Sequence, residues 1–355
     1  MLLTPVVMTT PPPPLHWINP ADRRLQYRGR WWVQKERALA VNTGSQLQAR
    51  FSGDWLALRF DASAYPHEPP ELWVRLDMQP WQKMEVAPLI ELAPDPPHFE
   101  HLLRMVFKGA REWDNRWTAP LQTAVVLTGI GLAEGGKLLD PPPRPALRIE
   151  FLGDSITEGV LLHRLDRPFP EAWPERADGR LGYAFQTGER LGADTRVVGF
   201  GRQGVTIEGN GGVPPAPDAF AWICEGVPRD DWQPHLVVIN QGTNDGSVPP
   251  DGFRPAYDRY LSLVRADYPD AHIFALRPFN GAHADDIRAV VEHRGAAGDA
   301  HLQFVDTTGW LDPTIDTTDG VHPSAMGHRK AAERLEAVIR AVLARFDEPR
   351  TRVVE

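Results

Sequence analysis

A proline-rich stretch divides this chain into two parts whose hydrophobic residues follow different patterns. It reads Asp140-Pro141-Pro142-Pro143-Arg144-Pro145. Each proline fixes its own φ and lacks a backbone N–H, so such a run is extended and stiff and does not continue a helix or a central strand. We therefore expect a linker here, with a separate fold on either side. The 355 residues of the chain are enough for two domains of ordinary size.

Short runs of alternating apolar and polar residues fill the part before the linker, and Gly, Pro and Asp interrupt them at near-regular spacing. These runs are residues 47–51, 55–60, 72–76, 101–107 and 124–127. Many short strands of this kind are typical of an antiparallel sandwich, which we assign to residues 16–140. Residues 1–15 include Pro11-Pro12-Pro13-Pro14 and are predicted to form an extended arm.

After the linker, continuous apolar runs alternate with helical patterns. The apolar runs are residues 147–152, 195–198, 236–239, 273–276 and 303–305, and the helical patterns are 183–191, 257–268, 284–291 and 324–346. Strands that alternate with helices predict an α/β domain with a parallel sheet covered on both faces. We assign this second domain to residues 146–350. Sites in open sheets of this type lie beyond the carboxyl ends of the strands.

Composition and charge exclude several classes of protein. With 42% hydrophobic and 24% charged residues, the chain has the composition of a globular protein rather than a disordered one. Its formal net charge is −9, and we find no basic stripe of the kind that binds nucleic acid. Cys224 is the only cysteine, so the chain forms no intramolecular disulfide.

The sequence also bears on location and on bound groups. The N-terminus lacks a basic start and a long apolar segment, which predicts a cytoplasmic protein, with secretion open if a leader has been trimmed. No apolar run reaches the roughly 18 residues of a membrane helix, so we expect no membrane partner. There is no His-Glu-x-x-His motif and no cluster of Cys and His, so we expect neither a metal nor another cofactor.

A serine follows the first strand of the second domain, in Gly153-Asp154-Ser155-Ile156-Thr157-Glu158-Gly159. A serine hydroxyl is a poor nucleophile at neutral pH unless a neighbouring base takes its proton. Ser155 is therefore a candidate nucleophile that needs a histidine. The alternative is an ordinary serine at the N-cap of a helix.

A histidine and an acid stand close together far downstream, in Asp319-Gly320-Val321-His322-Pro323. A histidine has the pKa of a general base, and an acid at one ring nitrogen fixes its tautomer and stabilises the imidazolium. Asp319 precedes His322 by three residues in a turn, which allows this contact. Asp319 is also the type of turn residue that bonds its own backbone, and Asp312 and Asp316 are nearby alternatives.

Two further segments complete a resemblance to the SGNH (GDSL) hydrolases, which covers roughly residues 145 to 345. The family's blocks are a GDS serine, a glycine, a GxND asparagine and a DxxH pair. They occur here in the same order, as Gly153-Asp154-Ser155, Gly204, Gly242-Thr243-Asn244-Asp245 and Asp319-x-x-His322. The resemblance implies a three-layer α/β/α domain with a flavodoxin-like parallel sheet.

The same resemblance implies a set of roles. Ser155, Asp319 and His322 would be catalytic, although some related enzymes use a Ser-His pair alone. The oxyanion hole would consist of the main-chain N–H groups of Ser155 and Gly204 and the side-chain amide of Asn244. A glycine lets the backbone come close to the substrate, and Gly199, Gly201 and Gly209 are alternatives for this place. Independently of the resemblance, the candidate substrate contacts are Arg202, Gln203, Trp173, Trp222 and Trp310, and the alternative for the three tryptophans is a place in the core.

A sandwich before such a domain is similar to the carbohydrate esterases of family 2, whose N-terminal domain is a jelly roll. The cues are Tyr27-Arg28-Gly29-Arg30-Trp31, Phe51-Ser52-Gly53, Leu76-Asp77 and Phe99-Glu100-His101 with Lys108. This resemblance implies a serine esterase that removes acetyl groups from carbohydrate such as xylan-type oligosaccharides, so that its partner is an oligosaccharide ester or another small ester. Two alternatives stay open: a general short-chain carboxylesterase or lysophospholipase, and a carbohydrate-binding protein that has lost activity.

Overall fold

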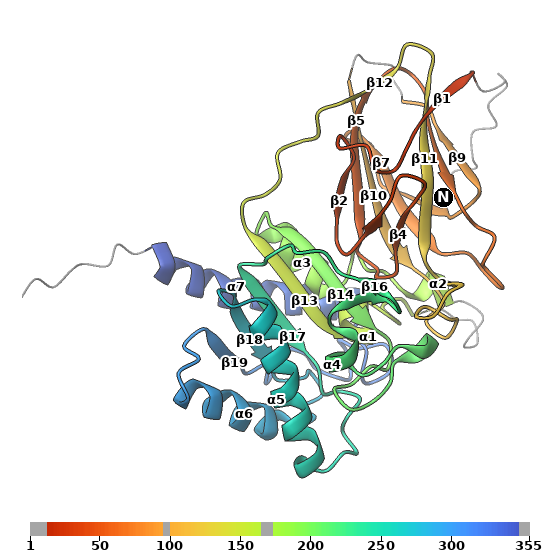
Figure 1. The fold of residues 1–355 in the computed structure, drawn as a ribbon. Coiled ribbons are helices and arrows are strands. Elements are labelled where there is room, and N and C mark those ends of the chain that lie inside the picture. Colours follow the sequence, from red (N-terminus) through yellow and green to blue (C-terminus); the bar gives the residue numbers. More distant parts are fainter. Residues whose placement is uncertain (1–12, 95–99, 165–172, 348–355) are drawn as a thin grey trace, which may run out of the picture.

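The structure is a computed structural model and describes residues 13–94, 100–164 and 173–347. It consists of an antiparallel β-sandwich followed by a parallel sheet with helices on both faces, as the sequence predicts (Figure 1). An extended segment leads from β12 (Lys137–Leu139) to β13 (Arg148–Asp154) along one side of the molecule, and it contains the proline-rich linker. Residues 1–12 of the predicted N-terminal arm lie outside the described residues.

Two sheets make up the sandwich. In one, the strand order is β3-β4-β11-β6-β9, with β1 paired to β11; in the other it is β12-β5-β10-β7-β8, with β2 paired to β5. The bounds in the first sheet are β1 Leu15–Ile18, β3 Trp32–Val33, β4 Ala38–Ala40, β6 Leu56–Phe60, β9 Leu89–Leu92 and β11 Val125–Ala133. Those in the second are β2 Gln26–Arg28, β5 Gln46–Ser52, β7 Glu71–Leu76, β8 Gln82–Glu85 and β10 His101–Gly109.

The order of these strands is that of a jelly roll. Strands β4, β11, β6 and β9 lie in one sheet and β5, β10, β7 and β8 in the other, so the chain passes between the sheets as it winds. Alternate residues point between the sheets, where Leu47, Leu58, Leu103 and Ile130 are fully buried. The alternating runs of the sequence therefore correspond to strands with one face in the core.

The second part contains a parallel sheet of order β14-β13-β17-β18-β19. The remaining bounds are β14 Asp194–Phe200, β17 Leu236–Asn240, β18 His272–Leu276 and β19 Leu302–Val305. The central strands β13 and β17 are buried over nearly their whole length. Burial on both faces explains why these strands are continuous apolar runs in the sequence.

Helices cover both faces of this sheet and complete three layers. On one face, α5 (Pro250–Asp267) and α6 (Ala284–Ala296) bury Tyr257, Leu261 and Ile287. On the other, α3 (Tyr183–Arg190) and α7 (Ala325–Asp347) bury Tyr183 and Leu335. Short elements complete the fold: α1 Ser155–Glu158, α2 Trp173–Arg176, the 3-10 helix η1 Asn210–Gly212, α4 Ala216–Ala219, β15 Trp222–Cys224 and β16 Val227–Pro228.

The start predicted for one helix is wrong. The helical pattern begins at residue 257 in the sequence, whereas α5 begins at Pro250. Proline is tolerated in a first helical turn, where the N–H has no partner within the helix. Pro255 lies inside the helix and removes one N–H, but the carbonyl that it leaves unpaired belongs to Asp251, which is exposed to water.

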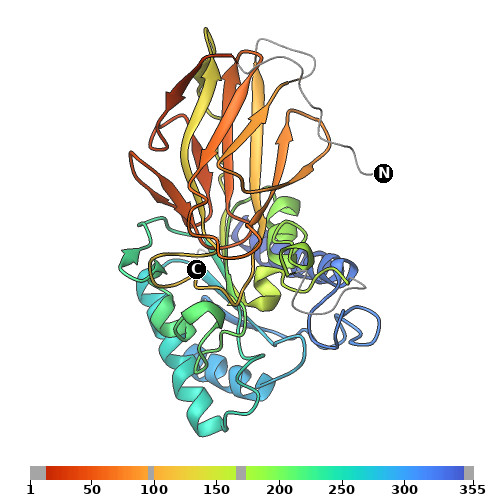
Figure 2. The ribbon, with the colours of Figure 1, turned by 90° about the vertical axis from the view of Figure 1, so that its right-hand side faces the viewer.

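The two parts of the molecule share a hydrophobic core. Leu39, Val41 and Trp117 of the sandwich pack in the same buried cluster as Val198 and Phe200 of β14. Figure 2 shows the loops at the lower end of the sandwich resting on the parallel-sheet part. Separation of the two parts would expose this apolar surface to water, which is unfavourable.

A buried ion pair joins the same two parts. Nε of Arg30, from the sandwich, lies 3.0 Å from Oε1 of Glu150 on β13, and both side chains are inaccessible to solvent. The hydroxyl of Tyr268 donates to the other carboxylate oxygen at 2.6 Å. Loss of one partner would leave a buried charge uncompensated, so this contact fixes the relative placement of the two parts.

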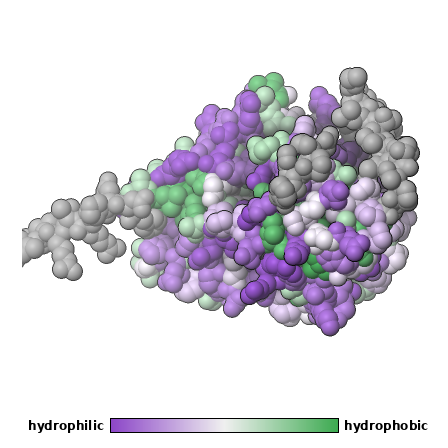
Figure 3. All heavy atoms as spheres, turned by 90° about the horizontal axis from the view of Figure 1, so that it is seen from above, coloured by the Kyte–Doolittle hydropathy of each residue, from purple (hydrophilic) through white to green (hydrophobic). Residues whose placement is uncertain are grey.

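The outer surface carries no large apolar area on the face seen from the sandwich end. That face is mainly hydrophilic, with small separate hydrophobic areas (Figure 3). None of the helices in the described residues combines the length and apolar character that crossing a membrane requires.

Candidate active site

Ser155 lies at the carboxyl edge of the parallel sheet. Strand β13 ends at Asp154, and the short helix α1 begins at the next residue. The N-cap of this helix is Asp154, whose Oδ1 accepts a hydrogen bond from the N–H of Ile156 at 2.9 Å. The capping role that the sequence left open for Ser155 therefore belongs to Asp154, and the serine hydroxyl is free for another contact.

That contact is with His322. Oγ of Ser155 lies 2.9 Å from Nε2 of His322, although 167 residues separate the two in the sequence. Nδ1 of the same ring lies 2.8 Å from Oδ2 of Asp319. Oδ1 of Asp319 accepts the N–H groups of Val321 at 3.0 Å and of His322 at 2.7 Å, so the carboxylate is held in place by its own turn.

The neighbouring acids have other partners. Oδ1 of Asp316 accepts from Nζ of Lys330 at 2.6 Å, and its Oδ2 accepts from the N–H of Asp312 at 3.0 Å. Oδ1 of Asp312 accepts from the N–H of Thr314 at 2.8 Å. Among the three acids that the sequence offered, Asp319 is the one that contacts His322.

The pKa values of this pair shift in opposite directions. Burial opposes the charged form of His322, but the hydrogen bond and charge of Asp319 outweigh it and raise the pKa of the imidazole. The charges of Asp154 and Glu112 act in the same direction. Burial also opposes the charged form of Asp319, but its hydrogen bonds with His322 hold the pKa of the carboxyl well below its usual range. The arrangement thus stabilises an imidazolium next to a carboxylate.

Two of the three predicted oxyanion donors, Asn244 and Gly204, have partners within the chain. Nδ2 of Asn244 donates to the carbonyl oxygen of Gln203 at 3.0 Å and lies 3.5 Å from Oδ2 of Asp154. The N–H of Gly204 donates to the carbonyl oxygen of Ile207 at 2.9 Å. An amide nitrogen carries two hydrogens, and the second hydrogen of Asn244 has only the long contact of 3.5 Å with Asp154, which a substrate oxygen can replace. Gly204 has a single N–H, and Ile207 accepts it.

Asp245 explains why residue 204 is a glycine. Its carboxylate accepts the N–H groups of Val205 at 3.0 Å and Thr206 at 2.9 Å. A Cβ at Gly204 would collide with both carboxylate oxygens of Asp245. The absent side chain makes room for this carboxylate, which holds the loop, rather than for a substrate. Asp154 and Asp245 thus both accept hydrogen bonds from backbone N–H groups.

Glu158, at the end of α1, joins three segments of the site. Its Oε2 accepts the N–H of Gly201 at 2.7 Å, and its Oε1 accepts from Nη1 of Arg116 at 2.8 Å. Both Glu158 and Arg116 are buried. Arg116 lies between β10 and β11, so a loop of the sandwich reaches the segment next to the nucleophile. No motif in the sequence marks either residue.

A second buried acid from the same loop packs against Gly201. Burial and the charge of Glu158 raise the pKa of Glu112 to about 7, although Arg116 opposes the shift. A Cβ at Gly201 would overlap the carboxyl group of Glu112. Burial raises the pKa of Asp154 to about 7 as well, against the hydrogen bond from Ile156. Two carboxyl groups that act electrostatically on His322 thus titrate near neutral pH.

His283 supports the turn that carries Asn244. Its Nε2 lies 2.8 Å from the carbonyl oxygen of Asp245, and its Nδ1 lies 2.8 Å from Oδ2 of Asp286. The ring therefore bridges the turn after Asn244 and the first turn of α6. The ring stacks on Phe253 at 3.8 Å between centroids, and Nε of Arg254 donates to Asp286 at 2.6 Å. No motif in the sequence indicated that His283 supports this turn.

The candidate substrate contacts differ from one another. Trp310 is a core residue in the layer of α3 and α7, and Trp222 is 38% exposed on β15. The side chain of Trp173 lies outside the described residues. Gln203 is buried and donates to the carbonyl oxygen of Pro214 at 2.7 Å, so its side chain faces inward.

Comparisons with known proteins agree with this geometry. Residues 151–330 match the model of the GDSL-like Lipase/Acylhydrolase family. Over 230 residues the chain is 34% identical to the cellulase/esterase CelE of Acetivibrio thermocellus. The aligned region covers 58% of this chain and 27% of CelE, so the chain spans about a quarter of the length of that relative. The chain is also 25% identical over 358 residues to the acetylxylan esterase / glucomannan deacetylase of Cellvibrio japonicus. This alignment covers 92% of the chain and 91% of that protein.

A solved structure extends the likeness to nearly the whole chain. It is a family two carbohydrate esterase from Clostridium thermocellum in complex with cellohexaose, at 26% identity and a TM-score of 0.75. The match covers 90% of this chain and 99% of that one, so it includes both the sandwich and the parallel-sheet part.

Proposed function

Because this chain belongs to the GDSL-like lipase/acylhydrolase family, we propose that it is a serine esterase that removes acetyl groups from carbohydrate, with xylan-type oligosaccharides as the substrate class. The observation that carries the proposal is the distance of 2.9 Å between Oγ of Ser155 and Nε2 of His322. The proposed catalytic domain, residues 146–350, holds the three catalytic side chains. The proposed sandwich domain, residues 16–140, contributes Arg116 and Glu112 behind them.

In the first half of the reaction, His322 takes the proton of the Ser155 hydroxyl as Oγ attacks the carbonyl carbon of the acetyl ester. The C–O bond to the sugar then breaks, and the sugar oxygen leaves with the proton from His322. Asp319 holds the ring so that Nε2 faces the serine. The result is an acetyl group on Ser155 and a free sugar hydroxyl.

In the second half, water takes the place of the sugar. His322 accepts a proton from the water molecule as the water oxygen attacks the acetyl carbon. The bond between the acetyl carbon and Oγ of Ser155 then breaks. The serine regains its proton from His322, and acetate leaves. No redox step or bound group is needed for this balance.

Negative charge develops on the acetyl oxygen in both halves, and donors must already face it. We assign this task to the N–H of Ser155 and to the second hydrogen of Asn244 Nδ2. Gly204 contributes only when its N–H leaves or shares the carbonyl oxygen of Ile207, so its role depends on a small shift of the loop at residues 204–207.

The substrate class rests on the relatives, which are carbohydrate esterases and an acetylxylan esterase / glucomannan deacetylase. The direct test compares the release of acetate from acetylated xylo-oligosaccharide with the hydrolysis of p-nitrophenyl acetate and p-nitrophenyl butyrate. We expect the highest kcat/KM on the acetylated sugar and lower activity on butyrate than on acetate. Equal or faster cleavage of the butyrate would contradict the sugar preference and identify a general carboxylesterase.

A further inference from the structure

Two arginines face each other across the outer surface of the sandwich. Arg75 on β7 and Arg104 on β10 are directly paired in the antiparallel register. Like charges at opposed positions repel each other and destabilise a sheet. In the described part of the chain neither guanidinium has an ion-pair or hydrogen-bond partner, and Nε of Arg75 is buried without one. The repulsion within this pair is therefore not balanced by an ion pair or a hydrogen bond to either guanidinium.

The two arginines line a hollow together with a third, Arg28 of β2. The hollow lies between the sandwich sheet and the end of α3, and Glu189 is the one acid among the described residues that line it. Gln26 positions Arg28, because its Oε1 accepts from Nε at 3.0 Å and from Nη2 at 2.9 Å. Arg28 also lies 4.0 Å from Oδ1 of Asp194, beside the hollow. Among the described residues, Arg75 and Arg104 are thus the two positive groups at the hollow that no ion pair neutralises.

The ring of Trp81 restricts the side chain of Arg75. The guanidinium of Arg75 lies over the ring of Trp81, 4.8 Å from its centroid, and that of Arg180 lies over the same ring at 5.2 Å. Such stacking restricts the side chain without neutralising its charge. Arg75 is consequently held ready for an anion, and the hollow needs little reorganisation to receive one.

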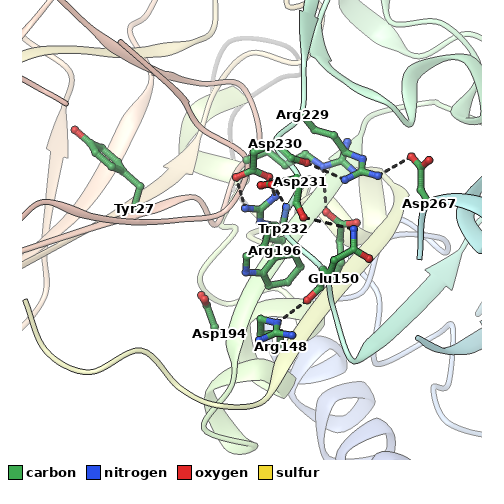
Figure 4. Close-up of polar contacts among 12 residues, drawn as sticks. Tyr27, Arg148, Glu150, Asp194, Arg196, Arg229, Asp230, Asp231, Trp232 and Asp267 are labelled. Atoms are coloured by element: carbon green, nitrogen blue, oxygen red, sulfur yellow. Dashed lines mark hydrogen bonds and ion pairs between the residues drawn. The ribbon is translucent and has the colours of Figure 1, made fainter. Parts of the chain in front are cut away.

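Arg196 and Arg229, by contrast, are paired with acids. Figure 4 shows the guanidinium of Arg196 directed at the carboxylate of Asp230 and that of Arg229 at Asp267, with distances of 2.7 Å and 2.6 Å. In the hollow, burial and the neighbouring charge of Arg75 lower the pKa of Arg104. Arg75 and Arg104 therefore differ from these paired arginines, because their nearest charged neighbour is another arginine and neither forms an ion pair or hydrogen bond within the described residues.

We propose that this hollow binds the carboxylate of an acidic sugar residue, such as a hexuronic acid, and so holds an acidic glycan on the sandwich. The nature of the ligand rests on the proposed function; the anion site itself rests on the arginines. A carboxylate accepts two parallel hydrogen bonds from one guanidinium, which is a geometry that arginine provides and lysine does not.

The site is separate from the active site. Thr195, near the start of β14, lines the hollow, whereas Phe200 ends that strand at the edge where Gly204 follows. At about 3.3 Å per residue, the strand spans roughly 20 Å. A ligand in the hollow thus leaves Ser155 accessible to another part of the same glycan.

The test measures binding to the full chain by calorimetry at low salt. The probes are a xylo-oligosaccharide with a glucuronic acid side group, the unsubstituted oligosaccharide of the same length, and inorganic phosphate. Hydrogen bonds to a carboxylate are stronger than those between neutral groups, so we expect the acidic oligosaccharide to bind at least about tenfold more tightly than the neutral one. Arg75→Gln and Arg104→Gln should each remove most of this difference. Arg59→Gln, on the other sheet, should leave it unchanged.

Equal binding of the acidic and neutral oligosaccharides would overturn the proposal, as would a preference that persists in Arg104→Gln. Displacement of the acidic sugar by equimolar phosphate would also overturn it and assign the site to phosphate. Without ligand, Arg104→Gln should unfold at the same temperature as the parent or higher, since it relieves repulsion; a lower temperature would indicate a structural role instead. The turnover of neutral acetyl esters by the parent protein is measured in parallel. If the esterase proposal fails, this turnover is absent while the acidic oligosaccharide still binds.

Discussion

Arg116 of the sandwich donates a hydrogen bond to Glu158, the third residue after the nucleophile, at 2.8 Å. The other oxygen of the same carboxylate holds the N–H of Gly201, in the loop that leads to Gly204. The contact lies in the interior, so it is not screened as a surface ion pair would be. The sandwich is thus connected both to α1, which begins at Ser155, and to the loop that runs from Gly201 to Gly204.

We predict that Arg116→Met lowers kcat on acetyl esters and destabilises the protein. Breaking a buried pair by removing one partner costs about 3–5 kcal/mol, because the remaining charge is left uncompensated. Chemical denaturation and steady-state kinetics measure the two effects. Arg111→Gln is the matched control, since Arg111 lies in the same loop and pairs with Glu68 instead. A double variant with Glu158→Gln should recover part of the stability; full activity in Arg116→Met would contradict the account.

The contacts among Ser155, His322 and Asp319 could be predicted from the sequence because each of these residues belongs to a short local motif. Parallel strands place their carboxyl ends at one edge, so Ser155 and Asn244 had to approach each other once the fold class was assigned. The turn that holds Asp319 against His322 is local as well. The triad therefore follows from a few local patterns and one topological rule.

Arg116, Glu112 and His283 could not be predicted in this way. Arg116 meets Glu158 across 42 positions of sequence, and the contact depends on how the sandwich seats on the second domain. Local patterns contain no information on that placement. A glycine at residue 204 was predicted for a different reason, namely close approach to the substrate, whereas a Cβ at this position would collide with the carboxylate of Asp245.

The pH dependence follows from the pKa of His322. Its ring must be neutral to accept the serine proton, and the pKa is raised from the ordinary value of 6.5 by Asp319 against the effect of burial. We therefore expect kcat/KM to fall as the pH decreases through a value above 6.5. Glu112→Gln should lower that value, because the charge of Glu112 favours the imidazolium. A profile that is flat from pH 5 to 8 would exclude His322 as the base.

The same shift has a consequence for stability. A raised pKa in the folded state contributes stability that is fully present below 6.5, the unfolded value, and is lost as the pH rises through the folded value. Asp319→Asn should remove this dependence. Denaturation at a series of pH values above 6 measures it.

Asn244→Ala should lower kcat by about a hundredfold to a thousandfold, the usual effect of losing one oxyanion donor, with a smaller change in KM. Asn280→Ala serves as the control, because Asn280 is exposed and its side chain bonds only the nearby N–H of Ala282 in the described residues. Comparable losses in the two variants would show that the effect does not arise from oxyanion binding.

His283→Gln should lower kcat more than it changes KM. Glutamine cannot donate to Asp286 and to the carbonyl oxygen of Asp245 in the same geometry, so the turn that carries Asn244 loses one of its supports. We expect a loss of about tenfold, equivalent to one hydrogen bond to a charged group. His67→Gln, at an exposed histidine that also faces an aspartate, is the control. An unchanged kcat would assign His283 a purely structural role.

The most direct measurement of the central claim is the rate of acetate release by Ser155→Ala, with circular dichroism to establish that the variant is folded. If the hydroxyl at this position attacks the ester, the rate at saturating acetylated xylo-oligosaccharide should fall by about a millionfold, as in other serine hydrolases that lose their nucleophile. A folded variant that retains a rate within tenfold of the parent would contradict the role of Ser155 as the nucleophile.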